Sequence, residues 1–393
     1  MIKKYAYSTI ILILFQSILF SQNFSFNYKK DDKYNIIVRG NVKIYLNGKY
    51  IGLNSKEAKI LFRVEDVKDS SFFVSGDVFK IDKTLRDTKS VGYKIDDSYK
   101  SSFTLNRSGM LKFEEGANIL IPNIITFPDK EVVINDSFES YGNVSLNFFN
   151  EEKPINLKTI TYSKYLGKKD YYGKNYDFFE INYGYVNDGS TKIKKTNGYH
   201  KIRFVFDNND GKPIFMDDHF EEEFLFENND IIKQSGFYLY FYKPIEKMDK
   251  NKVIEDLTTD FFVENTDFKN DFEFKKKDNG ISITLNNLKF KANTTDLLDS
   301  EKPKIDILYN LLKKIKDRTF VVEGHTALAG TETERQKLSE DRAKTIAELL
   351  IAKGIEQGKL LYIGKGAKEP VAPNDTEENM QKNRRVEILI LED

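Results

Sequence analysis

The chain has 393 residues with 61 basic and 61 acidic side chains, and it contains no cysteine and no tryptophan. The lack of cysteine excludes disulfides, thiolate metal sites and thiol nucleophiles together. The balanced charge leaves no broad basic field, which argues against nucleic acid as a partner. Phe and Tyr make up 13% of the residues and, together with many Val and Ile, they favour strands.

The N-terminus has the pattern of a secretory signal peptide. Lys3 and Lys4 precede an apolar run over 10–20, and the small Ser21 follows. We therefore expect residues 1–21 to be removed and the protein to be exported to the periplasm, in association with the outer membrane or the cell wall. The apolar run is shorter than the roughly 20 residues that span a bilayer; a buried helix is the alternative. Without a cysteine we do not expect a lipoprotein.

Short strand patterns follow one another from about residue 27 to residue 245. Segments 35–39 and 42–46 are predicted to be two strands joined by a turn at Gly40-Asn41. Turn signals recur at roughly ten-residue spacing, which is typical of an antiparallel sandwich or closed sheet.

The strand pattern is interrupted near Pro122 and Pro128. We therefore expect two β-rich subdomains, at 22–125 and 126–250. Residues 251–274 are expected to be a linker that could include one short helix.

Helix-period segments alternate with strands in residues 275–393. Gly354 is expected to end the longest helix as a C-terminal cap. The predicted fold class is α+β multidomain, with an antiparallel β-rich N-terminal region followed by a C-terminal α/β sandwich. The helices are expected over 252–262, 305–315, 333–353 and 376–382, and the C-terminal strands over 272–274, 281–285, 320–322, 360–363 and 386–390.

Five sequence blocks in the C-terminal third occur in an order typical of one family. They are Gly324-His325-Thr326, Leu338-Ser339-x-x-Arg342-Ala343, Gly354-Ile355, Gly364-x-Gly366 and Asn383-Arg384-Arg385-Val386-Glu387-Ile388. These blocks resemble the OmpA-like peptidoglycan-binding domain over roughly residues 275–393. The resemblance implies non-covalent binding to the peptide stem of peptidoglycan, and hence a protein that tethers the outer membrane or a partner to the wall. Residues 22–270 carry no such resemblance.

The resemblance also implies a pocket between the loop after the second strand and the start of the following helix. In the family, an aspartate directly after Gly-His-Thr binds the ammonium of a stem diamino acid, and the arginine of Leu-Ser-x-x-Arg-Ala binds its carboxylate. An arginine can bind a carboxylate through two parallel hydrogen bonds. The candidate ligand-binding residues are Arg342, Thr326, Ala327, Asn293, Leu338 and Arg385.

Ala327 departs from the family pattern, because it stands where the aspartate is expected. A methyl group cannot accept a hydrogen bond from an ammonium, and such a charge-assisted bond contributes roughly 1.5–3 kcal/mol. We therefore predict altered stem-peptide specificity. The alternative is a degenerate domain that serves as a structural or protein-interaction module with weak or no peptidoglycan binding. Glu332 and Glu334 could supply a carboxylate, but glutamates at a helix start are usually surface residues.

No enzyme motif is present: HExxH, GxSxG and Walker patterns are all missing. Asp217-Asp218-His219, followed by three glutamates, could hold a metal, but a charged strand edge is the favoured interpretation. His325 is expected to pack in its loop. We predict no enzymatic activity, no cofactor and no metal site, and we expect the β-rich region to space the domain from an outer-membrane protein partner or to bind that partner through a sheet edge.

Overall fold

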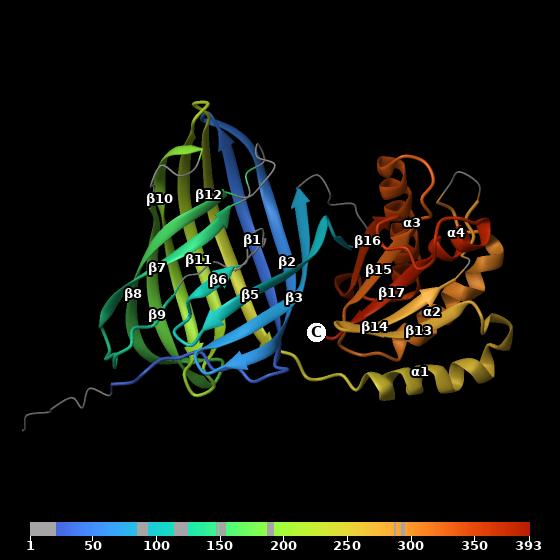
Figure 1. The fold of residues 1–393 in the computed structure, drawn as a ribbon, viewed down its shortest axis with the longest axis horizontal. Coiled ribbons are helices and arrows are strands. Elements are labelled where there is room, and N and C mark those ends of the chain that lie inside the picture. Colours follow the sequence, from blue (N-terminus) through green and yellow to red (C-terminus); the bar gives the residue numbers. More distant parts are fainter. Residues whose placement is uncertain are drawn as a thin grey trace, which may run out of the picture.

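The computed structural model describes residues 21–84, 93–113, 125–146, 148, 155–186, 192–286, 288–291 and 295–393. The predicted signal peptide, apart from Ser21, lies outside these residues. Among the helices of the described residues, none combines the length and the apolar character needed to cross a bilayer. Figure 1 shows two bodies, a strongly curved sheet and an α/β domain.

The described strands of the N-terminal body form a single antiparallel sheet of eleven strands, in the order β6-β5-β3-β2-β1-β12-β11-β10-β9-β8-β7. Its strands are β1 (Lys33–Leu46), β2 (Lys49–Lys68), β3 (Ser71–Thr84), β5 (Asp97–Asn106), β6 (Leu111–Phe113), β7 (Ser137–Leu146), β8 (Ile155–Tyr171), β9 (Lys174–Val186), β10 (Ile193–Asp207), β11 (Lys212–Phe226) and β12 (Ile231–Pro244).

The two ranges expected to form separate subdomains, 22–125 and 126–250, contribute to this one sheet. β1 pairs with β12 along its length, from Tyr34 opposite Pro244 to Leu46 opposite Ile232. This pairing joins residues about 200 positions apart, and no local pattern signals it.

Residues 33–46 form one continuous strand, so the predicted turn at Gly40-Asn41 was wrong. Gly40 lies where β1 meets β12, and a β-carbon there would collide with the Tyr238 ring and the Phe237 carbonyl oxygen. The glycine is therefore needed for close packing and does not turn the chain.

Aromatic side chains fill the inner face of the curved sheet. The segment before β1 contributes Phe24 and Phe26, both buried. The Phe24 ring centroid lies 5.0 Å from that of Phe179 on β9, and the Phe26 centroid lies 5.2 Å from that of Phe206 on β10. These edge-to-face contacts anchor the N-terminal segment inside the sheet.

The C-terminal domain has the predicted α/β architecture. Its sheet order is β13-β14-β17-β15-β16-β4, in which β4 is the short strand Tyr93–Lys94 from the N-terminal region. Helices α2 and α3 pack on one face. The elements are α1 (Lys250–Glu264), β13 (Phe272–Lys277), β14 (Gly280–Leu285), α2 (Lys302–Lys313), β15 (Phe320–His325), α3 (Glu332–Lys353), β16 (Leu360–Gly366), α4 (Glu377–Asn383) and β17 (Val386–Leu391), with short 3-10 helices at Thr266–Phe268, Asp299–Glu301 and Gln357–Lys359. The predicted α+β fold class is confirmed.

The range expected to be a linker, 251–274, is largely helical. α1 contains the predicted helix over 252–262, and Leu257 and Phe261 are buried in the C-terminal core. The apolar stripe of this helix packs against the sheet, so the range is part of the domain rather than a free connection.

The other face of the C-terminal sheet packs against the outside of the N-terminal sheet (Figure 1). Leu61 on β2, Phe79 on β3 and Leu389 on β17 belong to one buried apolar cluster. The short strand β4 (Tyr93–Lys94) leaves the N-terminal region and pairs in parallel with β16. The two bodies therefore share both a core and a sheet.

Candidate functional site

The loop that is expected to form one side of the family's ligand pocket connects β15 to α3. Thr331 caps α3: its hydroxyl accepts from the Glu334 backbone N–H at 3.3 Å, and the Glu334 carboxylate accepts from the Thr331 backbone N–H at 2.9 Å. This capping box satisfies two free donors of the helix start. Glu334, which could have replaced the missing aspartate, is therefore occupied at the helix start.

Small and polar residues hold α3 close to β15 and β16. A β-carbon at Gly324 would collide with the Ser339 carbonyl oxygen, and one at Gly364 with the Glu340 backbone. The Ser339 hydroxyl accepts from the Gly366 N–H at 2.9 Å and donates to the Gln336 carbonyl at 2.8 Å. The Gly-His-Thr, Leu-Ser and Gly-x-Gly blocks are thus explained in part by close helix–sheet packing.

Arg342 lies one turn after Leu338 on α3 and packs its guanidinium over Phe290, 4.8 Å from the ring centroid. Burial, with the nearby Arg384 charge second, lowers the pKa of Arg342 below its ordinary value. Among the described residues no carboxylate pairs with Arg342, and its buried Nε has no hydrogen-bond partner. A half-buried, unpaired cation stacked on an aromatic ring can accept an anionic ligand.

Thr326 and Ala327 follow the end of β15. The Thr326 N–H donates to the Gly366 carbonyl at 2.8 Å, whereas its buried hydroxyl has no partner among the described residues. Ala327 is only 3% exposed. Position 327 is therefore enclosed by protein, and its methyl group offers no hydrogen bond.

The remaining predicted site residues are placed differently. Leu338 is half-buried on α3, and Asn293 lies outside the described residues. Arg385 is buried, donating to Glu387 Oε1 at 2.7 Å and to the Glu369 carbonyl at 3.2 Å. It therefore lies on the sheet face opposite the helices. The charge that neighbours Arg342 is that of Arg384, whose own partner is Glu377.

Residues 289–384, which include Arg342 and the β15–α3 loop, match the family model described as "OmpA family". This segment is an OmpA-family domain. The chain is 35% identical over 104 residues to outer membrane porin F of Pseudomonas aeruginosa, a match covering 26% of this chain and 30% of that protein. It is 30% identical over 109 residues to the peptidoglycan-binding protein ArfA of Mycobacterium tuberculosis H37Rv, covering 28% and 33%.

A solved structure of an outer membrane protein from Borrelia burgdorferi B31 is 36% identical, covering 30% of this chain and 96% of that chain, with a TM-score of 0.26. The chain spans about a third of the length of the two curated relatives. The family match begins at residue 289, after the whole β-rich region.

One group in the OmpA-family domain has the composition of a metal site. Glu323, His325 and Glu387 bring ligand-type atoms within 4.8 Å of one another. Burial lowers the pKa of His325 to about 4, so its ring is neutral, and burial raises the pKa of Glu323 to about 7. However, the Glu387 carboxylate accepts a hydrogen bond from Arg385, and the Glu323 carboxylate lies 3.7 Å from Lys365 Nζ. A cation would compete with these side chains, so the two carboxylates are better described as members of buried ion pairs that lie beside the neutral ring of His325.

Two asparagines hold the β15–α3 loop and the segment before α4 in place, and the sequence did not identify either of them in this role. Asn383 is fully buried, and its side chain accepts from the backbone N–H groups of Val371 and Ala372 at 2.8 and 3.0 Å. Asn374 accepts from the Leu328 backbone N–H at 2.9 Å. These bonds link the loop before α4 to the β15–α3 loop. The signal that could have identified Asn383 in the sequence was its position at the start of the Asn-Arg-Arg block.

Proposed function

We propose that the OmpA-family domain binds the peptide stem of peptidoglycan non-covalently and tethers the outer membrane or a partner protein to the wall. The observation that carries the proposal is Arg342, a half-buried guanidinium over Phe290 with no carboxylate partner among the described residues. Stem peptides present carboxylates, and the guanidinium matches them bidentately. The relative named as a peptidoglycan-binding protein supports the same function.

The proposed site consists of Arg342 with Thr326, Ala327 and Leu338 around the β15–α3 loop. Arg342 takes the carboxylate of the ligand. This chain offers no aspartate to the ammonium of a diamino acid, because the residue at that position is the enclosed Ala327 and the neighbouring Thr326 hydroxyl is buried. The preferred stem therefore differs from that of family members with an aspartate at this position, and a residue with fewer charged ends is the better fit.

The protein acts in the periplasm after export, as a binding protein without enzymatic activity. The β-rich region sets the distance between the wall and the outer membrane or a protein partner there. A second candidate, suggested by Ala327, is a domain that has lost wall binding and contacts proteins instead.

Sedimentation with purified sacculi tests the proposal. Wild-type protein is expected to sediment with the wall, and Arg342→Ala to weaken binding about ten- to a hundredfold, as expected for a charge-assisted bond of roughly 1.5–3 kcal/mol. Lys337→Ala is the matched control, because Lys337 is an exposed cation on the same helix. Equal sedimentation of Arg342→Ala and wild type would remove Arg342 from the site.

Ala327→Asp separates the two candidates. Under the proposal the wild type already binds its own wall, and the variant shifts preference toward stems with a free ammonium. If wild type stays in the supernatant with every wall tested while Ala327→Asp sediments, the second candidate holds.

A further inference from the structure

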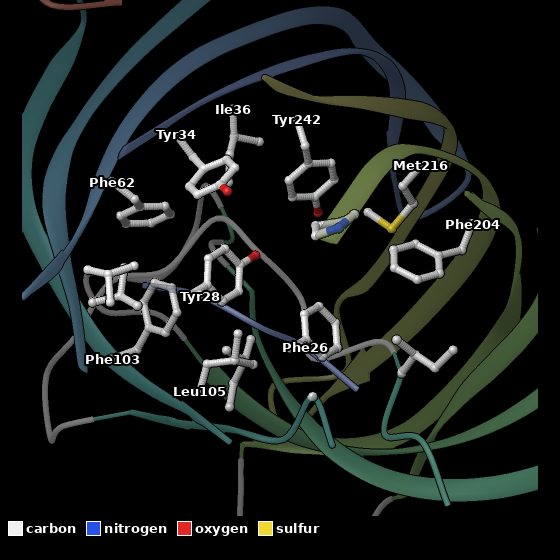
Figure 2. A pocket seen from close by; sticks show the side chains of 16 residues that line it. Phe26, Tyr28, Tyr34, Ile36, Phe62, Phe103, Leu105, Phe204, Met216 and Tyr242 are labelled. Carbon is white, nitrogen blue, oxygen red and sulfur yellow. The ribbon is translucent and has the colours of Figure 1, made fainter. Parts of the chain in front are cut away.

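A cavity of about 90 Å³ lies inside the curved N-terminal sheet, in a different body from Arg342 and the β15–α3 loop. Figure 2 shows the side chains that line it. Its walls come from both halves of the sheet and from the segment before β1. Most of the lining is apolar, including Ile36, Phe62, Val74, Phe103, Leu105 and Met216. A space of this size holds a short apolar group, and apolar walls of this kind release water readily.

Three tyrosines interrupt the apolar lining. In Figure 2 the hydroxyl groups of Tyr28, Tyr34 and Tyr242 point into the same central space. Burial raises the pKa of each of these groups, so they stay protonated and can donate. The cavity thus combines an apolar wall with a small group of converging donors.

Among the described residues, no side chain forms a hydrogen bond with the hydroxyl of Tyr28 or of Tyr242, and burial is the largest influence on the pKa of both groups. Buried tyrosine hydroxyls usually find a partner, because leaving one unpaired costs free energy. Two unpaired donors facing one cavity therefore point to an acceptor atom supplied from outside the chain.

The charge beside the cavity is already neutralised. The ammonium of Lys212 lies 5.2 and 5.1 Å from the ring centroids of Tyr28 and Tyr34, and it pairs with Asp32 at 2.8 Å. Because this pair carries no net charge, the cavity offers hydrogen-bond donors but no excess positive charge. A neutral acceptor fits it better than a carboxylate does.

We propose that this cavity binds a neutral acyl group, an apolar chain of a few carbons whose ester or amide carbonyl accepts hydrogen bonds from Tyr28 and Tyr242. The chain packs against the apolar wall formed by Val74 and its neighbours. Such a group can come from a small acyl ester or from an acyl chain of a lipid. This site is independent of wall binding, because it lies in the other body of the molecule.

Calorimetric titration of the mature chain with methyl hexanoate tests the proposal, with hexanoate as the charged comparison. We expect saturable binding of one ester per chain, and weaker binding of the anion. Tyr28→Phe and Tyr242→Phe are each expected to weaken binding about 2- to 13-fold, which is the effect of one neutral hydrogen bond. Tyr162→Phe is the control, because Tyr162 is 49% exposed on β8.

Val74→Phe is expected to abolish binding by filling the cavity, with thermal unfolding used to verify that the variant is folded. If it does not fold, the double variant Tyr28→Phe/Tyr242→Phe decides in its place. Absence of saturable ester binding by the folded wild type overturns the proposal. Unchanged affinity in folded Val74→Phe, or in the double variant, overturns it as well. Mass spectrometry of an organic extract of the purified protein distinguishes a small ester from a lipid as the source.

Discussion

Buried charge in the N-terminal sheet is organised around His200. Its Nδ1 lies 3.0 Å from both carboxylate oxygens of Asp218, and its Nε2 lies 3.7 Å from Glu222. The ring is stacked between Tyr183 and Phe220. Burial alone would lower the pKa of His200, but the two carboxylates outweigh it and raise the pKa to about 9. The imidazolium is therefore a structural cation at neutral pH.

This arrangement predicts a pH-dependent stability. A folded pKa above the unfolded value of 6.5 contributes stability that is fully present below pH 6.5 and is lost as the pH rises through 9. The loss is expected to reach up to about 3 kcal/mol. Urea unfolding between pH 6 and pH 9.5 measures it, as extrapolated free energies of unfolding.

The variant His200→Gln serves as the comparison. It should be less stable than wild type at pH 6, because it leaves Asp218 and Glu222 without their cation. Its stability should also change less between pH 6.5 and pH 9. A variant whose free energy of unfolding follows the same slope as wild type over this range would contradict the role given to His200.

At the scale of single elements, the position of α3 depends on how closely it approaches β15. Gly324 allows this approach, because any β-carbon would collide with the carbonyl oxygen of Ser339. Arg342 follows Ser339 by three residues on the same helix. The same packing that stabilises the domain therefore sets the height of the guanidinium above Phe290.

Gly324→Ala is expected to destabilise the OmpA-family domain by roughly 1–3 kcal/mol, the usual range for overpacking. Chemical denaturation of the purified variant measures the change. Gly358→Ala is the matched control: its added β-carbon would meet no atom closer than 3.8 Å, and its effect should stay within about 0.5 kcal/mol. Equal effects of the two substitutions would show that close approach of α3 is not what requires a glycine at 324.

At the scale of the whole molecule, the two bodies are joined by apolar packing, strand pairing and ion pairs. Ile95 is 1% exposed in the shared cluster, and its N–H donates to the Tyr362 carbonyl at 2.8 Å. Lys33 pairs with Glu392 at 2.5 Å, and Lys59 pairs with Asp393. The last residues of the chain thus lie against β1 and β2, and the OmpA-family domain has a defined orientation on the sheet.

Ile95→Asp is expected to separate the two bodies, because it places an unpaired charge in the buried cluster. Small-angle X-ray scattering should then show a larger radius of gyration and a broader distribution of distances. Ile51→Asp, at a position that is 45% exposed on β2, should leave the scattering profile unchanged. A compact profile for Ile95→Asp would mean that the interface does not depend on this cluster.

The C-terminal domain could be predicted in detail because its signals are local. The helical period over 333–353, the cap at Gly354 and the short apolar strands all act within a few turns of chain. The resemblance added Arg342 and the departure at Ala327. The resemblance did not show which of Arg384 and Arg385 faces Arg342, because the directions of their side chains depend on where α4 ends and β17 begins. The capping role of Glu334 agrees with the expectation of a helix-start residue.

The sequence by itself determined the strand content, the helices and strands of the C-terminal domain, and the position of the arginine that we propose binds the carboxylate of the ligand. Only the tertiary structure decided that β1 pairs with β12, that Asp218 and Glu222 turn inward to His200, and that three tyrosine hydroxyls share one cavity. The physical reason is how far apart along the chain the interacting residues lie. Periodicity and capping depend on neighbours along the chain, whereas sheet order, buried charge pairs and cavities depend on residues that meet only after the chain has folded.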